Sequence, residues 1–508
     1  IKPQMKSLYR PEIDGLRAIA VLGVLLFHLK VGLFSGGFLG VDVFFVISGY
    51  LITRNILNDA KSAKFTFSDF YIRRARRILP ALIFTVAATF VCGLLWLPPE
   101  LMRSLAKDST HTLLSIANIQ YWREAKEYFA TASDQLPLLH TWSLSLEEQF
   151  YLVWPMFLLA ALRWNRIAWA IALAGVVSFC FAVFWNAADP QAVFFLMPFR
   201  IFEFAIGAAA LFVEDRFRPK PNTAVALSVA GLLAVAASFT LFDEHSSFPV
   251  IAMLSSLGAA SVIVGGAQPV SVALLMNRPA LMIGKASYSL YLCHWPIIFF
   301  ARVIFGEAFQ TWQGSSISLA VMMLCALGMR RYIEQPFRQA STLSNNRTTA
   351  IRFVSLIVVL VALTHSTFMA SGLPWRITGE QQERAKLLDF GWSTCVQVKE
   401  NLCAFGELGA PLKIEMIGDS FSYQYADGLG DLLKRKNAKG EASFFYACPM
   451  LDGIRLKHDN PKSDRCQKTA TLALSKLKEN SIPVIIGQDW KSYKNESVTF
   501  DGNVNDAD

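Results

Sequence analysis

Residues 15–34 read GLRAIAVLGVLLFHLKVGLF, a block of 20 residues in which only Arg17, His28 and Lys30 carry basic or imidazole side chains. A helix needs about 20 predominantly apolar residues to cross the hydrocarbon core of a bilayer. The pattern therefore predicts an α-helical polytopic membrane bundle of about 11 transmembrane helices. The other predicted spans lie near residues 38–57, 79–97, 146–162, 167–186, 192–213, 222–242, 249–266, 286–304, 314–331 and 353–371.

The composition excludes a soluble globular protein for most of the chain. Of its 508 residues, 53% are hydrophobic and 17% are charged, whereas soluble domains carry about 25% charged residues. After about residue 375 the composition becomes that of a soluble domain. The chain begins with Ile1 and not Met, so we expect at least one residue to be missing at the front. The first apolar block lacks the small-residue cleavage site of a signal peptide.

The distribution of Lys and Arg predicts the orientation of the bundle. With a cytoplasmic N-terminus, the inside segments hold 23 Lys and Arg residues and the outside loops hold 6. Cytoplasmic loops of membrane proteins carry such an excess of basic residues. An odd number of spans then places the C-terminal domain outside. The net charge of +9 is thus a signal of topology, and we expect no nucleic-acid partner.

The eight cysteines divide into two groups of four. Those in the predicted spans are expected to be small buried apolar residues. Those in the C-terminal domain suit two disulfides in an oxidising compartment. Proximity alone favours the pairs Cys395–Cys403 and Cys448–Cys466, but the sequence does not fix the pairing.

Three polar side chains share one face of the first predicted helix. Arg17 and His28 are eleven residues apart, almost three whole turns, which puts them about 16 Å apart along the axis. Asp14 lies one turn before Arg17. Ionisable groups at membrane depth are costly and usually mark function, so the strip predicts the wall of a polar cavity. The alternative is a structural histidine hydrogen-bonded to a neighbour.

Asp42 introduces a carboxylate near the outer end of the second span. We expect it to lie beside His28, where an Asp–His pair would set the tautomer of the imidazole and raise its basicity. Asp42 is equally compatible with an N-terminal helix cap. Within the fourth span, Glu147 is expected to face inward. Arg200 and Glu203, one turn apart, are expected to form a structural pair.

Four arginines, Arg73, Arg74, Arg76 and Arg77, cluster before the third span. Arginine forks match the oxygens of phosphate groups, so the cluster is a candidate site for a phosphorylated cytoplasmic cofactor. The alternative is a topology anchor that contacts anionic lipid.

Arg17 and His28 are accompanied by four further motifs: GVDVFFVISG at 40–49, RRARRILP at 73–80, WSLSLEEQFY at 142–151 and His-Trp-Pro at 294–296. In these motifs, residues 10–340 resemble the acyltransferase family 3 membrane domain, which usually takes acetyl from acetyl-CoA and delivers it to extracytoplasmic glycans. The resemblance implies that Arg17 and His28 are a functional pair, and that Arg74 and Arg77 form the cytoplasmic arginine motif.

The C-terminal domain is predicted to begin near residue 411, after an eleventh helix and a periplasmic linker at 341–410. A buried strand at 412–417 runs into Gly418-Asp419-Ser420 and a helical stretch near 421–436. A serine at a strand-to-helix turn is well placed as a nucleophile, with backbone N–H groups nearby for an oxyanion. Further strands are predicted near 442–447 and 482–487.

This strand–turn–helix pattern resembles block I of the SGNH hydrolases, with Asp419 and Ser420 as the functional residues. The resemblance implies a flavodoxin-like three-layer α/β fold. Two departures stand out. The run at 487–490 lacks the asparagine of the family's Gly-x-Asn block, and the Asp-x-x-His block is absent, because His458 lies too early. We therefore expect residues 411–508 to be the N-terminal part of a domain that continues beyond this chain.

Together these resemblances imply an O-acetyltransferase that moves acetyl from cytoplasmic acetyl-CoA to a periplasmic glycan. Such domain fusions occur in O-antigen acetylases of the OafA and OafB kind, so the lipopolysaccharide O-antigen or its lipid-linked precursor is the favoured acceptor. Peptidoglycan or another exported glycan is the alternative within this class. A transporter or flippase is the alternative outside it. We expect a bacterial inner-membrane location, contact with membrane lipids and no metal.

Overall fold

The computed structural model forms two compact units, Ile1–Leu373 and Pro374–Asp508, and each is described by itself. In the first unit the structure describes residues 9–373 except 126–134, 165, 218, 244–245, 307–308, 310 and 340–345. In the second it describes residues 374–377, 396–399, 402–418, 422, 425–444, 454–455, 470–471, 475, 482–487 and 499–500.

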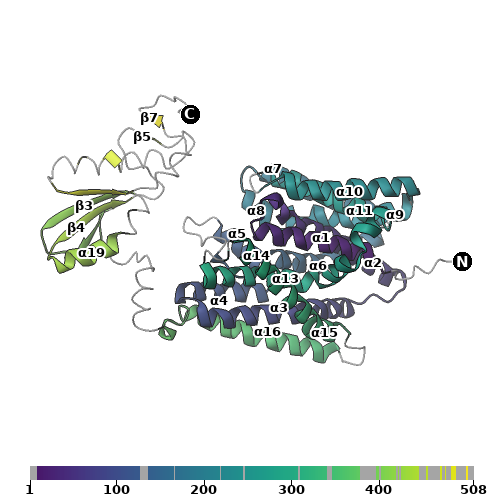
Figure 1. The fold of residues 1–508 in the computed structure, drawn as a ribbon, viewed down its shortest axis with the longest axis horizontal. Helices are drawn as coiled ribbons and strands as arrows, with labels where there is room; N and C mark the ends of the chain where they lie inside the picture. The colour runs from purple at the N-terminus through teal and green to yellow at the C-terminus, as the bar shows by residue number, and fades with distance from the viewer. Residues whose placement is uncertain are drawn as a thin grey trace. The chain divides into compact units, whose positions relative to one another are not determined.

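The first unit is a bundle of helices that run roughly parallel or antiparallel to one another (Figure 1). Its helices are α1 (Pro11–His28), α2 (Gly40–Lys61), α3 (Phe67–Trp96), α4 (Pro99–Leu113), α5 (Ala117–Glu124), α6 (Thr141–Arg163), α7 (Ile167–Trp185), α8 (Pro190–Phe195), α9 (Ile201–Phe217), α10 (Pro221–Leu241), α11 (Phe248–Gly265), α12 (Pro269–Leu275), α13 (Arg278–Phe305), α14 (Trp312–Met329), α15 (Gln335–Gln339) and α16 (Asn346–Met369).

Among the described residues, eight helices are long and apolar enough to cross a membrane: α2, α3, α7, α10, α11, α13, α14 and α16. The predicted spans near 15–34 and 146–162 correspond to α1 and α6, which carry three charged residues each, and do not belong to this group. The predicted count of 11 therefore stays a prediction.

The predicted continuous span near 192–213 is wrong. Helix α8 ends at Phe195, a short 3₁₀ turn covers Met197–Phe199, and α9 begins at Ile201. Pro198 lies in this turn and has no backbone N–H to donate, which favours a break over a continuous helix. The break brings Arg200 to the start of α9, where its side chain is fully buried.

The predicted outside loop between the third and fourth spans contains two helices that pack into the bundle. Helix α4 packs against α3 and α16, and α5 packs against α6. Asp108 of α4 is fully buried and accepts a hydrogen bond from Gln120 at 2.6 Å. Burial, together with the charge of Glu124, raises the pKa of Asp108 to about 8, so this carboxyl group is largely protonated at neutral pH.

Helices α2 and α9 approach closely because glycines face each other across their interface. A Cβ atom at Gly49 would lie 2.0 Å from the backbone oxygen of Phe204, and one at Gly207 would lie 1.9 Å from that of Val46. Small residues allow helix backbones to approach in membranes, where packing replaces the hydrophobic driving force. This contact fixes α2, which carries Asp42 and Ser48, against α9, which carries Glu203.

The second unit contains a five-stranded sheet in the order β1-β2-β4-β3-β6. Strands β3, β4 and β6 are parallel, whereas β1 and β2 are antiparallel to their neighbours. Helix α19 packs on β2 and β4 around a small core that includes Phe405 and Met416. The elements are β1 (Val396–Lys399), β2 (Leu402–Gly406), β3 (Leu412–Gly418), α19 (Ala426–Arg435), β4 (Lys439–Phe444) and β6 (Val484–Gly487), with a separate pair of β5 (Ile454–Arg455) and β7 (Thr499–Phe500).

These strands confirm the predicted β3 and β6, and β4 begins three residues earlier than predicted. Cys403 is disulfide-bonded, to a partner outside the described residues, so the predicted pairing stays a prediction. The cysteines of the bundle are free thiols, but the prediction that they are buried is wrong: Cys92 and Cys293 are partly buried, and Cys180 and Cys325 are exposed on the outside of the helices.

Gly207→Leu should lower the free energy of unfolding by about 3 kcal/mol or more, because its side chain has to displace the backbone of α2. The measurement is thermal unfolding of the purified protein in detergent. Gly328→Ala in α14 is the matched control, since a Cβ atom there meets nothing within 4 Å. Equal stability of the two variants would contradict the close α2–α9 contact.

Candidate functional site

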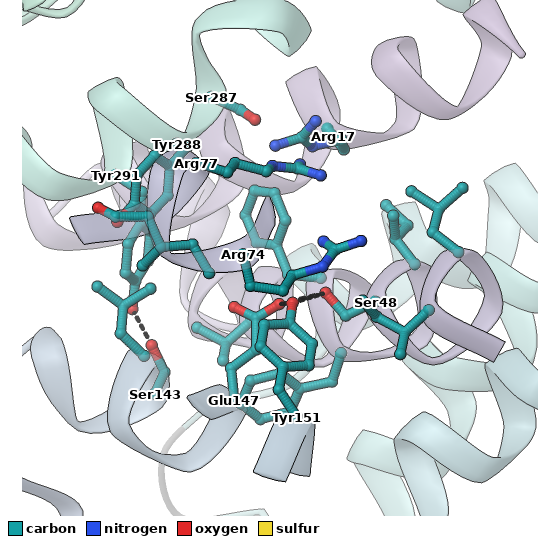
Figure 2. A pocket seen from close by; sticks show the side chains of 18 residues that line it. Arg17, Ser48, Arg74, Arg77, Ser143, Glu147, Tyr151, Ser287, Tyr288 and Tyr291 are labelled. Atoms are coloured by element: carbon teal, nitrogen blue, oxygen red, sulfur yellow. Dashed lines mark hydrogen bonds between the residues drawn. The ribbon is translucent and has the colours of Figure 1, made fainter. Parts of the chain in front are cut away.

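A narrow pocket lies near the N-terminal ends of α1 and α3, the ends that the sequence predicts to be cytoplasmic. Arg17 comes from α1, and Arg74 and Arg77 come from α3. Figure 2 shows the three guanidinium groups extending into the same space. The pocket encloses about 70 Å³, so it suits a small group such as an acetyl and not a whole nucleotide. Its other polar lining residues are Ser48, Ser143, Glu147, Tyr151, Ser287, Tyr288 and Tyr291.

The four predicted arginines divide between this pocket and the surface. Arg74 and Arg77 are three residues apart on one helix and therefore share a face. Arg73 is 55% exposed and pairs with Asp59 at 2.7 Å. Arg76 donates a hydrogen bond to Thr349 at 3.3 Å. Helical periodicity thus directs only two of the four side chains into the pocket.

The pocket concentrates positive charge. Arg17 lies 3.8 Å from Asp14, as the sequence predicts. Among the described residues, neither Arg74 nor Arg77 forms a salt bridge with a carboxylate. Three neighbouring guanidinium groups repel one another, and an anion such as a phosphate or thiolate would relieve this repulsion.

Glu147 faces inward, as expected, and lies beneath Arg74 (Figure 2). The hydroxyl groups of Ser48 and Tyr151 donate hydrogen bonds to its carboxylate. The guanidinium of Arg74 lies 5.6 Å from the centroid of the Tyr151 ring, a cation–π contact. The carboxylate is thus held in place by two donors. Neither Ser48 nor Tyr151 was a predicted site residue, although they lie in the runs at 40–49 and 142–151 that carry the family resemblance.

His28 lies in a cluster of three histidines and not in the arginine pocket. Its Nδ1 lies 3.1 Å from Nε2 of His294. The ring of His140 is 5.3 Å from that of His294, centroid to centroid. Trp295 packs on His28 with centroids 4.6 Å apart, and Arg302 donates a hydrogen bond to the backbone oxygen of His28 at 3.2 Å. The predicted face of α1 therefore serves two separate sites.

One turn of α13 joins the pocket to the histidine cluster. Tyr291 lines the pocket, and its hydroxyl group is 2.6 Å from the Ser143 hydroxyl and 3.0 Å from the backbone oxygen of His140. The backbone oxygen of Tyr291 lies 2.5 Å from Nδ1 of His294. The two sites are neighbours along the bundle because Tyr291 and His294 are one helical turn apart.

The predicted pair of Asp42 with His28 is wrong. Asp42 instead pairs with Arg200 at 3.0 Å, and both side chains are 1% exposed. The predicted Arg200–Glu203 pair is confirmed at 2.8 Å. The alternative reading of Asp42 as a cap is also wrong, because α2 has no side-chain cap hydrogen bond at its N-terminus. Arg200 lies 4.4 Å from the ring centroid of Phe248, which helps to seal the ion cluster.

The predicted site residues Ser420 and Asp419 lie outside the described residues. The nearby Ser422 is buried, and its hydroxyl group donates to the backbone oxygen of Gly487 at 2.5 Å. This bond ties the end of β6 to the segment that follows β3. No group of three His, Cys, Asp or Glu among the described residues has the arrangement of a metal site.

Comparison with known proteins assigns a family to each of the two parts of the chain. Residues 10–331 match the acyltransferase domain model, and residues 390–508 match the SGNH domain that is fused to such acyltransferases. The chain belongs to the acyltransferase family 3, in the group that carries a C-terminal SGNH domain. The resemblance predicted from the sequence is thus confirmed. No solved structure matches this chain.

Several named proteins are similar to this chain. The O-acetyltransferase OatA of Staphylococcus aureus strain MRSA252 is 30% identical over 404 residues, 74% of this chain and 65% of that protein. The peptidoglycan O-acetyltransferase OatA of Listeria monocytogenes serovar 1/2a is 32% identical over 351 residues, 65% and 56% of the two chains. The putative peptidoglycan O-acetyltransferase YrhL of Bacillus subtilis strain 168 is 33% identical over 369 residues, 68% and 57%. This chain thus spans from 56% to 65% of the lengths of these relatives.

Arg200→Met should lower the free energy of unfolding by about 3–5 kcal/mol, because Asp42 and Glu203 are left buried without a cation. Asp42→Asn should cost far less, since the Arg200–Glu203 pair remains. Thermal unfolding in detergent measures both. Equal losses for the two variants would show that Arg200 does not hold the cluster together.

Proposed function

We propose that this protein is an O-acetyltransferase that moves acetyl from cytoplasmic acetyl-CoA to a hydroxyl group of peptidoglycan. The similarity to proteins named peptidoglycan O-acetyltransferases supports this acceptor. The sequence favoured the lipopolysaccharide O-antigen or its lipid-linked precursor, and the comparisons instead support the peptidoglycan alternative. We propose an inner-membrane location with a cytoplasmic N-terminus. The disulfide at Cys403 supports a C-terminal unit outside the cytoplasm.

The convergence of Arg17, Arg74 and Arg77 on one pocket is the observation that carries the proposal. CoA is rich in phosphate groups. Arg74 and Arg77 form no salt bridge with a carboxylate among the described residues, so their guanidinium groups offer donors that match phosphate oxygens. The pocket is too small for the nucleotide. We therefore place the phosphates at the arginine entrance and the acetyl thioester inside, next to Tyr291. Glu147 lines the same pocket, and its carboxylate lies beneath Arg74.

His28 of α1 contacts His294, which lies one helical turn of α13 after the pocket residue Tyr291. This places His28 on the side of the pocket that is nearer the predicted outer surface. We propose that it acts on the acetyl group, either as general base or as transient acyl acceptor. Ser420 of the SGNH domain, with Asp419 beside it in sequence, would then receive the acetyl group or apply it to the sugar outside. The SGNH match argues against a transporter or flippase, because a carrier needs no hydrolase-like serine.

Arg74→Ala should raise the KM for acetyl-CoA by about 10-fold or more, since a charge-assisted hydrogen bond contributes about 1.5–3 kcal/mol. Arg73→Ala is the matched control, because it removes the same charge from the neighbouring position. Arg73 lies at the surface and pairs with Asp59, so this variant should change the KM for acetyl-CoA by less than about 2-fold. Radiolabelled acetyl-CoA supplied to inside-out vesicles provides the assay. Similar KM values for the two variants would contradict a donor site in the pocket.

His28→Ala should lower acetylation of peptidoglycan by about 100-fold or more while the protein still inserts into the membrane. Mass spectrometry of muropeptides and of lipopolysaccharide, from cells with and without the variant, measures the product. Unchanged acetylation with His28→Ala would refute the mechanism. Acetyl groups found only on lipopolysaccharide would refute peptidoglycan as the acceptor and would still support acetyl transfer as the reaction. Uptake of labelled substrate without glycan acetylation would instead support the transporter.

A further inference from the structure

The hydrogen bonds around His294 fix which of its ring nitrogens carries the proton. Nδ1 of His294 lies 2.5 Å from the backbone oxygen of Tyr291. A carbonyl oxygen only accepts hydrogen bonds, so Nδ1 must be the donor and carry the proton. In the neutral imidazole the other nitrogen, Nε2, then holds a lone pair. The site of that lone pair faces Nδ1 of His28 at 3.1 Å.

The neighbours of this pair favour two neutral rings. His294 is fully buried, and a buried imidazolium needs a counter-ion. Among the described residues, the titratable groups that contact the pair are His140, Tyr291 and Arg302, besides the rings of Trp295 and Phe27. His140 is itself held by a hydrogen bond from Nε2 to the backbone oxygen of Leu292 at 3.0 Å. Neither His140 nor Arg302 supplies a negative charge.

A neutral His294 determines the tautomer of His28. Nε2 of His294 carries no proton and can only accept a hydrogen bond, so the donor must be Nδ1 of His28. Nε2 of His28 then keeps the free lone pair. Trp295 packs against the His28 ring, and Arg302 holds the His28 backbone, so both fix the orientation of the imidazole. A carboxylate usually performs this orienting task for a catalytic histidine. Asp42 is unable to do so, because it pairs with Arg200.

We propose that His294 is a positioning residue that holds His28 with Nε2 as its reacting atom and that takes up the Nδ1 proton during acetyl transfer. The inference rests on the proposed function and deepens it, because it names the reacting atom of His28 and the group that receives its other proton. We write the transfer with His28 as the nucleophile, and in that step the negative charge of the released CoA thiolate offsets the positive charge that His294 takes up.

The transfer then balances in two halves. In the first, Nε2 of His28 bonds to the acetyl carbon, the C–S bond breaks with its electron pair on the CoA thiolate, and the Nδ1 proton moves to Nε2 of His294. In the second, the hydroxyl oxygen of the acceptor bonds to the acetyl carbon and the N–C electron pair returns to Nε2 of His28. His294 gives its proton back to Nδ1, and the hydroxyl proton neutralises the thiolate.

Two substitutions at His294 separate hydrogen bonding from mere space filling. His294→Gln places an amide oxygen where Nε2 was, so it still accepts the bond from His28 but takes up no proton. We expect kcat to fall by about 10-fold. His294→Leu removes the acceptor as well, and we expect kcat to fall by about 100-fold or more. In both variants the KM for acetyl-CoA should stay within about 2-fold, because the arginine pocket is unchanged. His365→Gln, an exposed histidine of α16, is the matched control and should keep full activity.

A chemical rescue tests the tautomer directly. In the His294→Ala background, replacing His28 with Nδ1-methylhistidine fixes the lone pair on Nε2, and the missing ring leaves room for the methyl group. We expect the rate to recover by about 10-fold over His294→Ala alone. Assays use the full chain in proteoliposomes with labelled acetyl-CoA and a soluble glycan acceptor, and thermal unfolding checks that each variant is folded.

The outcomes separate this inference from the proposed function. Loss of activity in His28→Ala together with near-normal kcat in His294→Leu would overturn the role of His294 and leave the proposed function intact. Failure of the methylhistidine to restore any activity would overturn the assignment of Nε2. Full activity of His28→Ala would overturn both. A trapped acetyl group on His28 after an acid quench, detected by mass spectrometry, would support the nucleophilic role.

Discussion

The need to give every charged side chain at membrane depth a partner organises this bundle, because an unpaired charge in hydrocarbon is costly. Two solutions occur side by side. Arg200 is sealed between Asp42 and Glu203 under aromatic rings, and its charge is satisfied within the protein. Arg74 and Arg77 instead face a pocket with no carboxylate in a salt bridge to them among the described residues. The first arrangement stabilises the fold, and the second provides an anion site.

Helix α13 connects the features that matter for function. It lines the arginine pocket through Tyr291 and the histidine cluster through His294, one turn later. It also packs along α1, which carries Arg17 near one end and His28 at the other. Tyr291 thus lies between the arginine pocket and the histidines that contact His28.

The amino-acid sequence by itself determined the class of this protein, the positions of most helices, the resemblance to acyltransferase family 3 and the inward orientation of Glu147. Apolar block length, helical periodicity and the distribution of Lys and Arg are local properties, so they can be read from the sequence without knowledge of the fold. The same periodicity placed Asp14 beside Arg17 and Glu203 beside Arg200, which the structure confirms. The packing of α4 and α5 into the bundle escaped prediction, because their polar residues are satisfied by one another.

Only the tertiary structure decided which polar groups meet across helices. Asp42 and Arg200 are 158 residues apart, and His28 and His294 are 266 residues apart. Such contacts depend on how helices rotate and cross, and helical spacing within a single segment carries no information about them. Asp42 was therefore assigned to the wrong partner. The same reason separates Arg74 from Arg73: the neighbouring helices determine which face of α3 lines a pocket and which faces the surroundings of the bundle.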